Sequence, residues 1–183
     1  MEPSGEYRLR LARNEDIGAL RALIEVSVRG LQSGDYTAAQ LDGALGTALG
    51  VDAQLIEDGT YYVAETREGK LIACGGWSKR KTLFGSDQLA NREDAFLNPA
   101  TDAAKIRAFF VDPGWTRRGI ATQILETCER AAKETGFRRY EMGATLTGVP
   151  MYAARGYAKG ERMEVALPNG ERYTVIRMTK SAE

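Results

Sequence analysis

Residues 109–121, FFVDPGWTRRGIA, set the architecture of the chain. They complete a largely apolar run from Ile106 to Val111 that is typical of a buried strand, and the Pro-Gly pair that follows predicts a turn. A helix is predicted from about Arg117 to Thr135, because apolar residues recur there at the spacing of one buried helix face. These apolar residues are Ile120, Ile124, Leu125, Cys128, Ala131 and Ala132. The stretch therefore joins a buried strand to a long amphipathic helix.

Arg117 and Arg118 stand at the predicted start of this helix, where the sign of their charge is unusual. A helix N-terminus already carries about half a positive charge from its unpaired backbone N–H groups, so a cation there costs roughly 0.3–1 kcal/mol. A bound phosphate group would offset this cost. Gly119 and Ala121 lack the bulk that would keep an anion away from the backbone. The alternative is a pair of solvated arginines beside a loop.

The known phosphate-binding loops narrow the choice of ligand. The sequence has no Gly-Lys-Ser/Thr triplet of a Walker A loop and no Gly-x-Gly-x-x-Gly of a dinucleotide fold. Val111-Asp112-Pro113 followed by residues 116–121, TRRGIA, resembles instead the acetyl-CoA loop of the GNAT superfamily of N-acetyltransferases. That signature is Gln/Arg-x-x-Gly-x-Gly/Ala after a strand that ends Val-x-Pro. Thr116 departs from the usual Gln or Arg, which weakens one side-chain contact and leaves the backbone cradle intact.

A later stretch, residues 151–157 (MYAARGY), resembles a second GNAT motif, in which a tyrosine stands four residues before a Gly-aromatic pair. The resemblance implies that Tyr152 protonates the departing CoA thiolate, which suits a phenol with a pKa of about 10. The alternative is a core tyrosine whose hydroxyl bonds to the backbone. Thr145 stands where many members have Asn, and its hydroxyl can still hydrogen-bond the pantetheine arm.

The GNAT resemblance implies an α+β fold in which a mixed, mainly antiparallel sheet of about seven strands is flanked by about four helices. It implies acetyl-CoA as cosubstrate, bound by a core motif at 106–136 and a late motif at 145–157 of a single domain spanning residues 1–183. The pantetheine arm would pair with the strand before the turn, and a backbone N–H near Phe110 or Val111 would polarise the thioester carbonyl. The expected catalytic residue is Tyr152. The expected cosubstrate-binding residues are Phe109, Phe110, Val111, Arg117, Arg118, Gly119, Ile120, Ala121 and Thr122.

The acceptor implied by the resemblance is a small-molecule or peptide amine, which must lose a proton before or during its attack on the thioester. Some GNAT members carry a Glu on the central strand, but this chain has Lys105 at the matching position. Glu141, Asp112 and a chain of water molecules are left as alternatives. By position alone, four residues are candidates for the acceptor cleft and equally for the core: Arg29, Asp35, Tyr36 and Trp77.

Composition excludes several other classes of function. The 183 residues carry 25 basic and 25 acidic side chains, so no net charge draws the chain to nucleic acid or to a membrane surface. The absence of histidine excludes His-based triads and His metal sites, and no metal is expected. Cys74 and Cys128 are interpreted as buried thiols of a reducing compartment. Without a signal peptide or an apolar run of about 18 residues, a cytoplasmic enzyme is predicted, and a homodimer is left open.

The remaining segments complete the expected element order β-α-α-β-β-β-α-β-α-β-β. The expected strands are 7–12, 60–65, 70–77, 106–111, 138–142, 157–167 and 172–178, and the expected helices are 17–29, 37–49, 117–135 and 148–155. The helix at 37–49 has a thin apolar face and is expected at the surface as a lid or rim. Residues 79–104 show no period, so they are expected to form a partly ordered loop beside the mouth of the active site. The basic run 79–81 is expected either to contact the 3′-phosphate of CoA or to form a solvated strand end.

Two other functions are compatible with these motifs. A non-catalytic acyl-CoA-binding regulator would keep the cradle at 117–121 without turnover, and the retained Tyr152 argues against it. A structural interaction domain would use the arginine pair to bind a carboxylate of a partner protein. Binding of CoA distinguishes the acetyltransferase and the regulator from the interaction domain. Release of the CoA thiol then distinguishes the acetyltransferase from the regulator.

Overall fold

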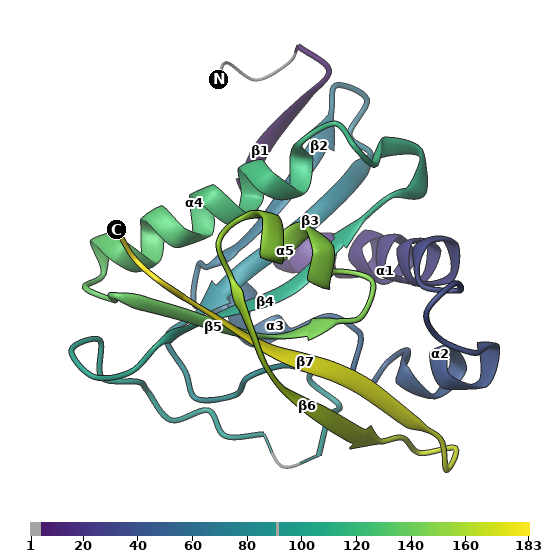
Figure 1. Ribbon diagram of the computed structural model, residues 1–183. Helices are drawn as coiled ribbons and strands as arrows, with labels where there is room; N and C mark the ends of the chain where they lie inside the picture. Colours follow the sequence, from purple (N-terminus) through teal and green to yellow (C-terminus); the bar gives the residue numbers. More distant parts are fainter. Residues whose placement is uncertain (1–4, 91) are drawn as a thin grey trace.

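The computed structural model describes residues 5–90 and 92–183 (Figure 1). Within them, seven strands form one sheet in the order β1-β2-β3-β4-β5-β7-β6. The strands are β1 Tyr7–Leu11, β2 Tyr61–Thr66, β3 Leu71–Ser78, β4 Ala104–Val111, β5 Arg139–Thr145, β6 Ala158–Ala166 and β7 Arg172–Ser181. The α-helices are α1 Ile17–Leu31, α2 Ala38–Ala44, α3 Ala53–Glu57, α4 Ile120–Glu134 and α5 Val149–Ala154. The predicted α+β class and seven-stranded, mainly antiparallel sheet are confirmed, with five α-helices in place of four.

The sheet opens at its centre, between β4 and β5. Every other neighbouring pair is antiparallel, but β4 and β5 run parallel and pair at only two positions, Ala104 with Tyr140 and Lys105 with Glu141. Beyond Lys105 the described residues of the two strands form no further pairs. Because a strand presents backbone N–H and C=O groups to the neighbour on each side, this leaves the β5-facing edge of β4 without a strand partner.

Helices cover both faces of the sheet and form a separate apolar core on each. Figure 1 shows α4 and α5 in front of the sheet, with α1 and α3 behind it. The buried residues of α4 are Ile120, Ile124, Leu125, Cys128 and Ala132, as the helical spacing predicts. The buried apolar residues of α1 are Leu20, Leu23, Ile24 and Val28. Each large aliphatic side chain buried in this way stabilises the fold by about 1.5–3 kcal/mol, so the two cores hold β3 and β4 firmly between them.

α4 begins three residues later than predicted. Arg117 and Gly119 both take the left-handed backbone conformation, with φ of 60° and 77°, and the first helical residue is Ile120. The prediction was wrong here because an apolar stripe marks the buried face of a helix but carries no information on the dihedral angles before its first turn. The two arginines therefore lie in the turn that leads into the helix.

The predicted helix at 37–49 is also shorter than expected. Thr37 caps α2, but the helix ends at Ala44, and Gly46 with φ of 84° turns the chain into a loop. The short helix α3 then follows with Asp52 as its N-cap. A helix of five residues is too short to show a periodic pattern, so the sequence analysis assigned no element there.

Residues 79–90 and 92–103 lie between β3 and β4 largely without regular structure, yet buried groups hold parts of this segment in place. Arg107 of β4, which is 3% exposed, donates hydrogen bonds to the carbonyl oxygens of Thr82 (3.0 Å) and Gly85 (2.6 Å). The Arg107 guanidinium also lies 2.7 Å from the carboxylate of Asp52. Ser86 donates from Oγ to a carbonyl of the loop after α2 at 3.0 Å. The irregular segment is thus tied to β4 and to the loop between α2 and α3.

Candidate active site

A groove of about 1330 Å³, open to solvent, is lined by α1, β4, the turn before α4, the first turn of α4, the end of β5 and α5. Tyr152 lines this groove, as do eight of the nine predicted cosubstrate-binding residues. The eight are Phe109, Phe110, Val111, Arg117, Gly119, Ile120, Ala121 and Thr122. The fold therefore brings together the two motifs that the sequence analysis identified, although about 30 residues separate them along the chain.

The floor of the groove is a bulged edge of β4. The register of β3 against β4 shifts by one residue near Ala108, which takes φ of 58°. This left-handed conformation costs a non-glycine residue about 1–2 kcal/mol, so the surroundings must hold it. The Ala108 carbonyl accepts a hydrogen bond from the Tyr61 hydroxyl at 3.3 Å and lies 3.6 Å from Sγ of Cys74. The bulge places the Phe109 ring across Gly75, where an added Cβ would lie 2.8 Å from the ring atoms.

The turn before α4 directs backbone N–H donors into the groove. Gly119 is the N-cap of α4, and the helix has neither a side-chain cap nor an acidic residue in its first turn. The N–H groups of residues 120–122 therefore have no acceptor within the helix. By contrast, Thr37 caps α2 with its side chain. Arg117, which also lines the groove, adds positive charge at the same end.

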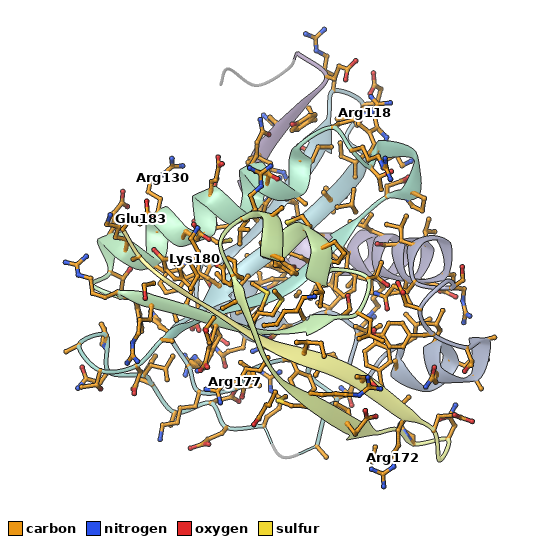
Figure 2. The ribbon with its side chains drawn as sticks, in the orientation of Figure 1. Arg118, Arg130, Arg172, Arg177, Lys180 and Glu183 are labelled. Atoms are coloured by element: carbon orange, nitrogen blue, oxygen red, sulfur yellow. The ribbon has the colours of Figure 1, made fainter. Side chains whose placement is uncertain are left out.

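Arg118 is the one predicted cosubstrate-binding residue that does not line the groove. Its guanidinium lies 4.5 Å from the centroid of the Trp115 ring and 3.4 Å from the carboxylate of Glu6. Figure 2 shows Arg118 near the N-terminal end of α4, far from Glu183. An exposed ion pair of this kind contributes at most about 1 kcal/mol. Of the two arginines in the motif, Arg117 is the one that lines the groove.

Tyr152 belongs both to the core and to the groove. It lies on α5, is 8% exposed, and packs edge-on against Phe109 and Tyr157 with ring centroids 6.1 and 6.0 Å away. Burial raises the pKa of the Tyr152 phenol, because a phenolate would be poorly solvated in this position. The side chain is therefore held in one place and stays protonated at neutral pH, as a proton donor must be.

A second cavity, called the chamber below, begins where the groove ends. The chamber and the groove share Phe109, Phe110, Thr145 and Tyr152. Two loops form part of the chamber wall: residues 48–50 after α2 and residues 83–85 of the irregular segment. The irregular segment thus reaches the candidate site, where the sequence analysis expected it.

The two carboxylates considered as the general base lie outside the groove and the chamber. Glu141 contacts Lys105 and lies 2.6 Å from the guanidinium of Arg177, which Figure 2 labels on β7. Burial and the neighbouring Arg177 lower the pKa of Lys105 to about 8. Asp112 pairs with Lys70 at 2.9 Å. Among the described residues that line the two cavities there is no Asp or Glu, which favours water as the proton acceptor.

The other candidates taken from position alone lie elsewhere. Tyr36 and Trp77 are buried in the two apolar cores. Arg29 forms ion pairs at the surface, and Asp35 accepts a hydrogen bond from Thr147 at 2.7 Å. In the basic run 79–81, the middle residue, Arg80, pairs at 2.8 Å with Asp58, the C-cap residue of α3.

Ser27 of α1 is a groove residue that the sequence analysis missed. Its Oγ accepts a hydrogen bond from the backbone N–H of Val111 at 3.1 Å, and the residue is 3% exposed. A single serine among the apolar residues of a helix carries no motif. Only the packing of α1 against β4 brings it to the edge of the strand, so no local signal could have identified it.

The comparison with known families agrees with this geometry. The model of the family described as Acetyltransferase (GNAT) matches residues 27–157, which include the groove motif and α5. The chain belongs to the GNAT acetyltransferase family. Acyl transfer is accordingly the activity class of this GNAT protein. No curated protein matches its sequence.

Solved structures resemble the GNAT protein over nearly its whole length. A GCN5-related N-acetyltransferase from Rhodopseudomonas palustris is 21% identical with a TM-score of 0.69, covering 99% of this chain and 98% of that one. The PaiA N-acetyltransferase from Thermoplasma acidophilum, solved with coenzyme A, is 12% identical with a TM-score of 0.63, covering 96% and 98%. The N-acetylglutamate synthase from Neisseria gonorrhoeae, solved with coenzyme A and N-acetylglutamate, is 20% identical with a TM-score of 0.61, covering 97% and 35%. At these identities the likeness establishes the fold alone.

No helix among residues 5–90 and 92–183 of the GNAT protein has the length and apolar character to cross a membrane.

Proposed function

We propose that this GNAT protein transfers an acetyl group from acetyl-CoA to a primary amine, by direct attack within a ternary complex. One observation carries the proposal: the uncapped N-terminus of α4, the unpaired edge of β4 and Tyr152 meet in one groove. Acetyl-CoA supplies the activated thioester. The chain supplies donors for a diphosphate, a strand edge for an amide-containing arm, and an acid for the sulfur.

The diphosphate is assigned to the turn before α4. Backbone N–H groups at a helix N-terminus and the helix dipole both favour a bound anion, and hydrogen bonds to charged groups contribute about 1.5–3 kcal/mol each. The turn has room for the ligand, because no described heavy atom beyond Gly119 and the adjoining backbone lies within 4 Å of the position that a Cβ of Gly119 would occupy. Arg117 adds a cation from the groove wall. These features explain why a helix without a cap at its N-terminus is tolerated.

The pantetheine arm is assigned to the edge of β4, because extended ligands with amide groups add to exposed strand edges. On this edge the backbone N–H of Val111 already donates a hydrogen bond to an oxygen atom of a groove residue, Oγ of Ser27. A carbonyl oxygen of the ligand is proposed to take the place of the Ser27 oxygen. This assignment brings the acyl end of the ligand toward Phe109, Phe110 and Tyr152, where the groove meets the chamber.

Tyr152 is assigned the role of general acid. As the amine nitrogen bonds to the acetyl carbonyl carbon and the C–S bond breaks, the Tyr152 hydroxyl donates its proton to the departing sulfur. The raised pKa keeps the hydroxyl protonated until it is needed. No carboxylate lines the described parts of the groove or the chamber, so the amine is proposed to lose its proton to water.

Two matched hydroxyl deletions test this assignment. We expect Tyr152→Phe to lower kcat by about a hundredfold, a typical effect of losing a general acid, and to change the Kd for acetyl-CoA less than threefold. The phenyl ring keeps the packing against Phe109 and Tyr157. Tyr157→Phe is the control, because the Tyr157 hydroxyl donates to Glu129 at 2.8 Å and does not line the groove. Tyr157→Phe should keep the wild-type kcat.

The measurements are thiol release with a panel of primary amines and calorimetric titration of acetyl-CoA. An unchanged kcat in Tyr152→Phe would remove Tyr152 from the mechanism. Tight binding of acetyl-CoA without thiol release for any amine would favour the non-catalytic acyl-CoA-binding regulator. Failure to bind CoA would favour the interaction domain.

A further inference from the structure

The lining of the chamber restricts which amines can act as acceptors; this inference rests on the proposed function. An acyl group that reaches Tyr152 along the groove faces the chamber, so the acceptor must approach through it. Of the sixteen described residues that line the chamber, only Arg107, Thr145 and Tyr152 have polar side chains. The larger apolar side chains of the wall are Leu49, Leu83, Phe84, Ile106, Phe109, Phe110 and Met142.

Arg107 is the single cation in this lining, and its charge is already balanced. It is 3% exposed, and its guanidinium lies 2.7 Å from the carboxylate of Asp52, which is fully buried. Its donors are directed to the carbonyl oxygens of Thr82 and Gly85. These bonds hold residues 83–85 in the chamber wall, so Arg107 cannot turn to a ligand without releasing that wall.

The two remaining polar groups offer little to a charged ligand. The Thr145 hydroxyl accepts a hydrogen bond from the backbone N–H of Gly148 at 3.0 Å. The Tyr152 hydroxyl is assigned as the proton donor to the departing CoA sulfur. A carboxylate brought into the chamber would lose its hydration without gaining an ion pair, and an ammonium group would also lose its hydration there.

We propose that the acceptor is a primary amine on an apolar substituent, without a carboxylate next to the amine-bearing carbon, and that it binds in the chamber as the uncharged free base. The apolar wall stabilises the substituent by removing it from water. Free amino acids are excluded by their carboxylate and not by their size.

A matched triplet of acceptors separates charge from size: 2-phenylethylamine, phenylalaninamide and phenylalanine. A second triplet, n-butylamine, norvalinamide and norvaline, repeats the comparison with a smaller side chain. We expect kcat/KM for the amine to exceed that for the amino acid by at least a hundredfold in one or both triplets, equivalent to roughly 2.7 kcal/mol. The amide keeps the bulk without the charge, so it should retain at least a tenth of the kcat/KM of the amine.

A variant that adds a cation to the chamber wall tests the inference by favouring acceptors that carry a carboxylate. Leu83→Lys places a cation in the wall and should raise the ratio of amino acid to amine kcat/KM at least tenfold. Ala90→Lys adds the same charge at an exposed position of the same irregular segment and should leave the ratio unchanged.

Three results would overturn the inference while the proposed function stands: equal or higher kcat/KM for the amino acids, amides as poor as the acids, or turnover of spermidine without turnover of any apolar amine. Absence of acetyl-CoA binding would instead overturn the proposed function itself. Calorimetric titration of acetyl-CoA before the acceptor assays distinguishes the two failures.

Discussion

Gly75 shows how one residue without a side chain shapes the groove. Phe109 lies across it, and a Cβ at Gly75 would be 2.8 Å from three atoms of the ring. Gly75→Ala should therefore push the ring toward Tyr152 and into the groove. Overpacking of this kind costs about 1–3 kcal/mol, so we expect a loss of unfolding free energy of about 1 kcal/mol and a several-fold higher KM for acetyl-CoA. Urea denaturation and initial-rate kinetics measure the two effects.

Gly18→Ala is the matched control for this substitution. Gly18 is exposed in the first turn of α1, and no described heavy atom outside its neighbours along the helix lies within 4 Å of an added Cβ. The same change should raise the unfolding free energy by up to about 1 kcal/mol, through helix propensity, and leave the KM unchanged. If Gly75→Ala behaved like Gly18→Ala, the placement of Phe109 over Gly75 would be wrong.

At the scale of elements, the sequence predicted what depends on neighbours along the chain. The apolar stripe of α4 and the run before Pro113 identified a long helix and a buried strand. The first residue of α4 was not predicted, because it depends on the positive φ of Arg117. The helix α3 was not predicted, because five residues are too few to show a helical period. The gap between β4 and β5 was not predicted, since no residue pattern marks where two strands cease to pair.

The site divides in the same way. Tyr152 and eight other groove residues were predicted by number, because each motif is one continuous stretch of chain. Ser27, Arg107 and the chamber wall were not predicted, because they depend on contacts between segments far apart in the sequence. The side chain of Arg118 could not be distinguished from that of Arg117 in the sequence, since only the backbone of the turn decides which of them faces the groove.

At the scale of the whole molecule, zero net charge conceals local ion pairs that make stability depend on pH. Glu65 on β2 pairs with Arg10 at 3.1 Å and with Arg8 at 3.0 Å on β1. These hydrogen bonds, with Arg10 the stronger influence, lower the pKa of Glu65 from 4.5 to about 2. A carboxylate whose pKa is lower in the folded state stabilises the fold above its unfolded pKa, and this stabilisation is lost as pH falls.

The unfolding free energy should therefore fall as pH is lowered from 5 to 3, and Glu65→Gln should make that fall smaller by about 1 kcal/mol, the upper end for pairs near solvent. Urea denaturation of both proteins at pH 5 and pH 3 measures the difference. An identical pH dependence in the variant would show that the contacts with Arg8 and Arg10 do not persist in solution.

The proposal that a diphosphate binds at the N-terminus of α4 is tested most directly by a titration of CoA into two matched variants. Ala121→Glu places a carboxylate at the second residue of α4, on the groove wall, and Ala39→Glu makes the same change at the second residue of α2, which is exposed. A Glu in a first turn favours either helix, so both variants should fold. The carboxylate introduced by Ala121→Glu would repel a phosphate group of CoA, because two like charges about 4 Å apart repel by roughly 4 kcal/mol near a protein surface. We predict a Kd for CoA at least a hundredfold higher in Ala121→Glu and unchanged in Ala39→Glu, and equal binding by the two variants would contradict the account.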